Sequence, residues 1–304
     1  MKNTFALLIT VISFFGMECS FASGKIYFPS TSAPLDTFYW KKEFQAGTNF
    51  NQATFSNNWK AGGNNSMALG LLFHGTATYE KAKHKWRNEL QTDYGFQKLK
   101  GSSSRKTLDR IFFDTKYAYD LNKKLSLFGS ANLVTQFAQG FSYSPDSAGV
   151  EKPSYVSHFF SPAYLIEAMG VQYHPLSYLT FDFGVGGLRH TFVTDTTLYK
   201  QVPNNYGVPI GSKMRTQAVF QFTANFDKEV LKNIVIKTRY AAVLDYEKLR
   251  AKNIVHRVDF SLNAKVNKWI SASLTSILLY DIDQDSQIQY NQMLGIGILY
   301  NTNK

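Results

Sequence analysis

Apolar and polar residues alternate almost without a break along the C-terminal part of the chain. From Asn253 to Val266 one set of alternate positions is mostly apolar and the other polar, and beyond Asn267 the alternation resumes as far as Tyr300. A period of two places the two sets on opposite faces of a β-sheet. The runs are longer than most globular strands and suit a tilted strand that crosses a bilayer. One face can meet lipid only if the sheet closes into a barrel.

The same alternation, interrupted by turn residues, predicts about twelve strands. They span residues 40–51, 65–79, 84–95, 106–119, 124–138, 161–174, 178–191, 212–226, 233–246, 252–266, 269–282 and 287–300. Connections alternate between short ones (80–83, 120–123, 175–177, 267–268, and the slightly longer 227–232) and longer ones (52–64, 96–105, 139–160, 192–211). We therefore predict an all-β fold, a single closed antiparallel transmembrane barrel with short periplasmic turns and long extracellular loops.

Aromatic residues gather near both ends of the predicted strands, as in the belts that anchor barrels at the two membrane interfaces. The ends near the short turns carry Tyr39, Trp40, Tyr79, Trp86, Tyr117, Tyr119, Tyr173, Tyr178, Phe226, Trp269 and Tyr300. The opposite ends carry Phe50, Tyr94, Phe137, Phe141, Tyr246, Tyr280 and Tyr290. A preference of aromatic residues for strands explains their number but not this clustering.

The N-terminus predicts export. Lys2 precedes an apolar run over residues 5–15, which is too short to span a membrane, and small residues at Ser20 and Ala22 suit a cleavage site. We predict a signal peptide at 1–22, a periplasmic lead at 23–39 and the barrel at 40–304. Cys19, the only cysteine, would leave with the signal peptide. The mature chain would then have no disulfide and no thiolate chemistry.

Charge and hydropathy exclude two further classes of protein, those with transmembrane helices and those that bind nucleic acid. The chain has no continuous run of roughly eighteen apolar residues, as a transmembrane helix requires. The net charge of +11 is a reason to consider nucleic acid, but the basic residues are interleaved with acidic ones and an exported chain meets little of it. We expect no nucleic-acid partner. Outer-membrane lipid, and the barrel-assembly machinery during biogenesis, are the predicted partners, and the cell outer membrane is the predicted location.

Along each predicted strand, charged side chains occur mostly at the alternate positions that should face the lumen (the inward parity); the other alternate positions form the outward parity. The outward parity carries residues such as Phe113, Phe222 and Ile236, since a charge on the lipid face would cost about 2–4 kcal/mol near the midplane. The lumen-lining candidates are Lys85, Arg87, Glu89, Arg110, Asp114, Arg215, Lys237, Arg239, Arg257 and Asp259, and the same parity holds Gln91, Asp93, Lys116, Asp245 and Lys265.

Two interpretations of these inward charges stay open. They could line a polar, slightly basic pore that favours anionic solutes. Alternatively, pairs of Arg87 or Glu89 with Arg110 or Asp114 could fill a small barrel.

The sequence contains no pattern that predicts an enzyme. A lipid-cleaving barrel would need an imidazole beside a serine hydroxyl on the lipid face. None of the six histidines (74, 84, 158, 174, 190 and 256) is followed by serine two positions later. No pair of histidines has a metal-ligand spacing with nearby carboxylates, and the glycine-rich segment 184–187 lies inside a strand, where it indicates a bend or a close approach. We predict no catalytic residue, cofactor or metal ligand.

Several short motifs resemble an uncharacterised family of Bacteroidota outer-membrane barrels, catalogued as a domain of unknown function. They are the loop from Asn49 to Ser66, Trp86-Arg87-Asn88-Glu89-Leu90 with Tyr94-Gly95, Thr135-Gln136-Phe137 with Gly140-Phe141, Ser161-Pro162-Ala163-Tyr164-Leu165 with Gly170, Tyr173-His174-Pro175, and Tyr280-Asp281 with Gln289. The resemblance extends over nearly the whole mature chain and implies export and a barrel, but supplies no activity. One departure is that four residues follow Tyr300, where barrels usually end in an aromatic residue.

The sequence therefore predicts a non-enzymatic outer-membrane barrel. Its role would be that of a narrow, weakly anion-selective solute channel, or of a structural or accessory component of an envelope complex. The alternative is an outer-membrane enzyme that acts on lipid or on an envelope polymer.

Overall fold

The computed structural model describes residues 39–54, 65–101, 103–145, 147, 151–267 and 270–301. The chain divides into two units, Met1–Phe38 and Tyr39–Lys304, and all the described residues belong to the second. The predicted signal peptide (1–22), the lead as far as residue 38, most of the loop 52–64 and the tail after Asn301 lie outside the described residues. The same is true of Trp269.

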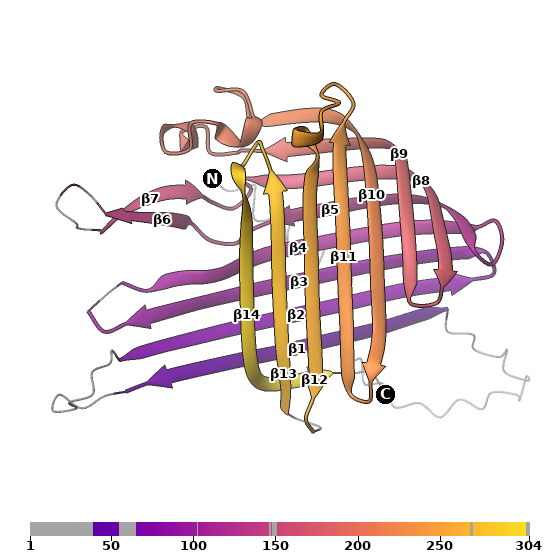
Figure 1. Ribbon diagram of the computed structural model, residues 1–304, viewed down its shortest axis with the longest axis horizontal. Helices are drawn as coiled ribbons and strands as arrows, with labels where there is room; N and C mark the ends of the chain where they lie inside the picture. The colour runs from indigo at the N-terminus through magenta and orange to yellow at the C-terminus, as the bar shows by residue number, and fades with distance from the viewer. Residues whose placement is uncertain are drawn as a thin grey trace, which may run out of the picture. The chain divides into compact units, whose positions relative to one another are not determined.

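The described chain is built from β-strands joined by turns, with three short 3-10 helices in the loops (Figure 1). The elements are β1 (Trp40–Ala53), β2 (Ser66–Lys81), β3 (His84–Leu99), β4 (Arg105–Asp120), β5 (Leu125–Thr135), β6 (Gly140–Pro145), β7 (Glu151–Ser157), β8 (Ala163–Leu176), β9 (Leu179–Phe192), η2 (Leu198–Lys200), η3 (Asn205–Gly207), β10 (Met214–Leu231), β11 (Ile234–Asp245), η4 (Ala251–Asn253), β12 (Val255–Lys265), β13 (Ile270–Asp281) and β14 (Asp285–Asn301). The predicted all-β, antiparallel class is confirmed.

All strands except β6 and β7 belong to one closed sheet, in which β1 lies between β2 and β14. The closing seam is short, since β1 and β14 pair only from Gln45 with Asn301 to Thr48 with Ile298. In Figure 1 the strands β1 to β5 cross those of β11 to β14, as tilted strands on opposite walls of a barrel do. The interior between these walls is the core of the fold.

Connections of different length lie at the two ends of this barrel. Those at one end, the short-turn rim, are 82–83, 121–124, 177–178, 232–233 and 266–269. Those at the other end, the long-loop rim, are 54–65, 100–104, 136–162, 193–213, 246–254 and 282–284. The connection expected at 96–105 is shorter than predicted because β3 and β4 continue into it. The connection expected to be a loop at 139–160 contains the hairpin of β6 and β7, which the sequence analysis did not predict.

Exposure follows the alternation of the sequence. On β4 the inward side chains of Phe112 and Ala118 are each 4% exposed, whereas the outward side chains of Phe113 and Tyr117 are 39% and 45% exposed. A residue that points into a closed barrel is shielded by the opposite wall, and one that points outward is not. No helix among the described residues is long and apolar enough to cross a membrane.

The glycine-rich segment of β9 forms a bulge. The pairing register shifts there on both sides, against β8 and against β10. A Cβ atom on Gly170 would lie 1.9 Å from the carbonyl oxygen of Phe183, and one on Gly187 would lie 2.9 Å from that of Val219. Only glycine allows backbones to approach so closely, so the predicted bend or close approach is confirmed.

Candidate functional site

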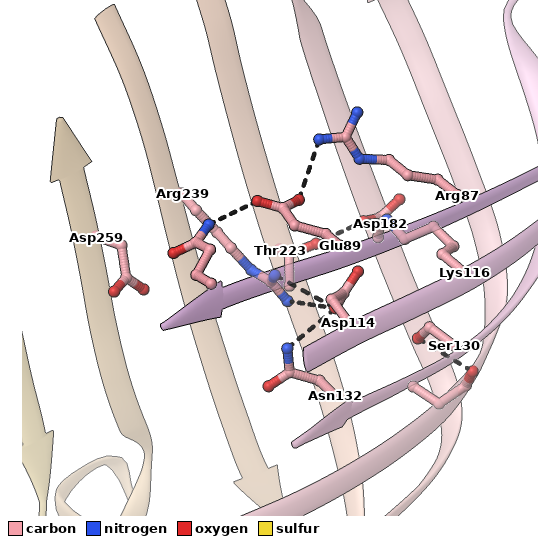
Figure 2. A network of polar contacts seen from close by, with 12 residues as sticks. Arg87, Glu89, Asp114, Lys116, Ser130, Asn132, Asp182, Thr223, Arg239 and Asp259 are labelled. Carbon is pink, nitrogen blue, oxygen red and sulfur yellow. Dashed lines mark hydrogen bonds and ion pairs between the residues drawn. The ribbon is translucent and has the colours of Figure 1, made fainter. Parts of the chain in front are cut away.

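The middle of the lumen is crossed by ion pairs, the first of them centred on Asp114 of β4. Its carboxylate accepts a hydrogen bond from Asn132 Nδ2 at 3.0 Å and contacts both terminal nitrogens of Arg239 at 3.4 Å (Figure 2). Asp114 is 7% exposed. Arg239 comes from β11, which is separated from β4 in the sheet by β10, β9, β8 and β5. The contact therefore joins opposite walls.

A second group of contacts surrounds Asp182 of β9, which is 3% exposed. The carboxylate is paired with Lys116 of β4 and accepts a hydrogen bond from Thr223 Oγ1 at 2.6 Å (Figure 2). It also accepts a hydrogen bond from Gln172 Nε2 of β8 at 2.5 Å. Four strands thus meet at one buried charge. A cavity of about 10 Å³ lies between this group and Asp114, which is about the space that one water needs.

The third group lies nearer the long-loop rim and joins β4 to β12. Arg110 lies 3.5 Å from Asp259, and the same carboxylate accepts two hydrogen bonds of 2.8 Å from Arg257. The guanidinium groups of Arg110 and Arg239 lie over the ring of Phe112, at 4.7 and 5.4 Å from its centroid. The Phe112 ring thus contacts both inward guanidinium groups. Cation–π attraction to this ring adds to the ion pairs that Arg110 and Arg239 make with Asp259 and Asp114.

Glu89 of β3 is held from its own side of the barrel. It accepts hydrogen bonds from Gln91 at 2.6 Å and Arg87 at 3.0 Å, and contacts His74 Nε2 at 2.8 Å. The predicted pairing of Arg87 or Glu89 with Arg110 or Asp114 is wrong. In the register, Glu89 lies opposite Asp114, so like charges face each other and each turns to another partner.

Near the long-loop rim the most buried ion pair joins β9 to β13. Arg189 is 5% exposed and Asp281 1% exposed, and they are bonded across the lumen. Arg215 of β10 contacts Asp283 at 2.8 Å. Beside them lies a cavity of about 30 Å³, lined by residues that include Gln217, whose side-chain oxygen has no partner among the described residues. This cavity has room for about two waters.

The ten residues predicted to line the lumen thus lie in four different parts of the barrel. Arg110, Asp114, Arg239, Arg257 and Asp259 form the central contacts, Arg87 and Glu89 lie on one wall, and Arg215 is near the long-loop rim. The remaining two lie at the short-turn rim, where Lys85 pairs with Asp120 at 2.8 Å and Lys237 with Asp227 at 3.1 Å.

Sequence reasoning missed Asp182 and Arg189. Both face inward although one position is even and the other odd, because the bulge in β9 between them adds a residue and reverses the parity. A strict period of two cannot place both on one face. The glycine run 184–187 was the signal that could have revealed the reversal. Asp281 lies at a polar alternate position of the predicted strand 269–282, but the pattern does not reveal its partner Arg189, which lies on β9.

The connection between β9 and β10 reaches across part of the long-loop rim. Its own small core consists of Val193, Leu198 and Val208, with Tyr155 and Tyr206 packed against it. Burial raises the pKa of Tyr206 to about 12. Asn204 Nδ2 donates to the carbonyl oxygens of Asp283 at 2.9 Å and Gln284 at 3.2 Å in the turn between β13 and β14, which anchors the loop over the mouth.

One outward-facing contact bears on the enzyme alternative. Thr216 Oγ1 lies 2.9 Å from His190 Nδ1, a distance suited to a nucleophile and its base. Glu167 approaches the other ring nitrogen only to 3.8 Å, and its side chain is 51% exposed. A catalytic base needs a third group that orients it by a hydrogen bond, and this contact is too long for one. Within the described ranges no cluster of three or more His, Cys, Asp or Glu could hold a metal ion.

Comparison with known proteins gives a family match over part of the chain. Residues 50–141 match the family described as "Protein of unknown function (DUF3078)". The predicted resemblance to a family of unknown function is confirmed, although the match extends only from the end of β1 to the start of β6. The bacterial phylum stays a prediction. No curated protein matches.

Several solved structures are similar to the chain at low identity. The NanC porin is 9% identical, with 84% of this chain and 98% of that chain covered and a TM-score of 0.38. The translocator domain of the autotransporter NalP from Neisseria meningitidis is 11% identical, with 86% of each chain covered and a TM-score of 0.33. The KdgM porin is 10% identical, with 86% and 99% covered and a TM-score of 0.31. Scores this low carry no argument about function.

Proposed function

We propose that this chain is a non-enzymatic β-barrel of the outer membrane whose lumen is closed across its middle. Its role would be structural or accessory within the envelope, rather than that of an open pore. Support for the membrane setting comes from the closed strand order, the exposed apolar side chains on the outward face, and connections whose lengths differ between the two rims. Outer-membrane lipid is then its solvent, and the barrel-assembly machinery its partner during biogenesis.

The observation that carries the closed lumen is the contact of Arg239 with Asp114 from opposite walls. The inward side chains around it are almost fully shielded, with Phe112 at 4%, Gln221 at 7% and Thr223 at 4% exposure. In a water-filled channel such side chains would be exposed to solvent. Side chains that interdigitate across a small barrel leave a packed core.

A narrow channel is the second candidate, favoured by the length of the central contacts. The Arg239–Asp114 and Arg110–Asp259 distances are 3.4 and 3.5 Å, longer than a well-formed ionic hydrogen bond. If the two walls separated there, Arg110, Arg239 and Arg257 would line the opening with two carboxylates among them. Such a ring of charges would give a weak preference for anions.

Planar-bilayer recording of the purified, refolded barrel separates the two candidates. We expect wild-type protein to insert, as shown by flotation with vesicles and by heat-modifiable gel mobility, and to give no stable conductance. Steady single-channel steps from the wild-type protein would overturn the closed lumen and support the channel. In that case the double variant Arg239→Glu with Arg257→Glu should shift the reversal potential in a salt gradient towards cation preference.

A further inference from the structure

The short-turn rim carries a ring of exposed lysines. Its turns contain Lys83, Lys123, Lys124 and Lys232, and no acidic residue occurs in the described positions 82–83, 121–124, 177–178, 232–233 and 266–267. Within the described part of the chain none of these four lysines is ion-paired.

Acidic residues next to these turns face the lumen instead. Asp120 is paired with Lys85 at 2.8 Å and Asp227 with Lys237 at 3.1 Å, both on the inward parity. Glu229 accepts a hydrogen bond of 2.8 Å from the backbone N–H of Asn233, inside a turn. These three carboxylates therefore have bonded partners, whereas Glu80 beside Lys81 is exposed. The four turn lysines have no ion pair among the described residues.

Three lysines of this rim lie over aromatic rings of the interfacial belt. Nζ of Lys81 is 4.8 Å from the ring centroid of Tyr39, and Nζ of Lys228 is 4.3 Å from that of Tyr178. Nζ of Lys83 is 5.9 Å from the ring centroid of Tyr119. Tyrosine side chains of such belts lie at the level of the lipid headgroups. The contacts hold three ammonium groups at that level, two at the hairpin of β2 and β3 and one near the end of β10.

The long-loop rim carries some paired cations and also exposed cations with no ion pair among the described residues, such as Lys98, Lys100 and Lys213. Lys106 is paired with Asp109 at 2.7 Å, and Arg105 is paired with Glu151 of β7. Glu167 also lies on the outward face near this end. Among the described residues, the short-turn rim differs in that exposed lysines without an ion pair lie over tyrosine rings there. The cation over a tyrosine ring near the long-loop rim, Arg105 over Tyr143, is itself ion-paired.

We propose that the short-turn rim binds the phosphates of anionic glycerophospholipids in the leaflet that surrounds it. The inference rests on the proposed function, which places this rim in the periplasmic leaflet of the outer membrane. The lysine stems would lie along the apolar wall while the ammonium groups reach the headgroup phosphates. Each basic residue at a membrane surface contributes on the order of a fivefold preference for anionic over neutral lipid.

Lipid retention tests the inference. The refolded barrel would be placed in vesicles of phosphatidylcholine with a small fraction of phosphatidylglycerol, then extracted in mild detergent, and the retained lipids quantified. We expect phosphatidylglycerol to be enriched severalfold over its fraction in the vesicle. The triple variant Lys81→Gln, Lys83→Gln and Lys228→Gln should lower this enrichment severalfold, although Lys123, Lys124 and Lys232 remain.

The matched control is Lys200→Gln, Arg250→Gln and Lys252→Gln, which removes the same charge from loops at the long-loop rim and should keep the enrichment. Equal enrichment in the wild-type protein and the first triple variant would overturn the inference, and so would release of the lipid by millimolar glycerol phosphate, which would indicate a site for free phosphate. Insertion into pure phosphatidylcholine vesicles, read by flotation and heat-modifiability, tests the proposed function separately.

Discussion

Replacing Asp281 by leucine should lower the free energy of unfolding of the barrel by about 3–5 kcal/mol, because the change leaves the guanidinium of Arg189 buried without its counter-ion. The two side chains are 1% and 5% exposed, so water cannot solvate the unpaired charge. The double variant Arg189→Met with Asp281→Leu should recover most of this loss, since neither charge then remains inside the barrel. Urea unfolding in detergent micelles, followed by tryptophan fluorescence, measures both.

The matched control for this pair is Asp227→Leu at the short-turn rim. Asp227 pairs with Lys237, but the two side chains are 55% and 39% exposed, so the loss should be only about 0–1 kcal/mol. Equal losses for Asp281→Leu and Asp227→Leu would show that the interior near the long-loop rim is solvated. The description of a filled lumen would then be wrong.

Replacing Leu274 by arginine should prevent most of the chain from reaching the folded state in vesicles. Leu274 faces outward on β13, and a charge on the lipid face costs about 2–4 kcal/mol near the midplane. Thr275→Arg at the next, inward position should cost less, because the new cation would enter a polar and only partly buried surface. The folded fraction, read by heat-modifiable gel mobility, compares the two variants.

A suitable inward control must not be fully packed. Gln221 on β10 is 7% exposed, so an arginine there would overfill the interior as well as add a charge, whereas Thr275 is only partly buried. Equal folding yields for Leu274→Arg and Thr275→Arg would show that the outward face of β13 does not meet hydrocarbon.

Alternation was enough to place the inward residues of regular strands. Arg110, Asp114, Arg239 and Asp259 lie on the inward side because their strands keep an unbroken period of two near them. The same reasoning failed in β9, where a bulge reverses the parity between Asp182 and Arg189. In this bulge, Gly170 of β8 and Gly187 of β9 lie against backbone atoms of neighbouring strands, so the pattern of β9 alone contains only part of the information.

Whether the lumen is open or filled could not be predicted from the pattern. Inward charges suit both a pore and a set of buried pairs, and the difference depends on which walls approach each other. Arg239 finds Asp114 from 125 positions away along the chain, on a strand that is not its neighbour. The hairpin of β6 and β7 was also missed, because its strands are short and lie within a segment rich in turn residues.

Cysteine labelling of intact cells tests most directly whether the barrel spans the outer membrane with its long-loop rim outside. Ser144→Cys lies in the hairpin of β6 and β7 and Lys123→Cys in a turn of the short-turn rim, and both positions are exposed. The only cysteine in the sequence, Cys19, lies in the predicted signal peptide. We predict that a membrane-impermeant maleimide labels position 144 in intact cells and position 123 only after the outer membrane is permeabilised. Labelling of position 123 but not of 144 in intact cells, or equal labelling of both, would contradict the account.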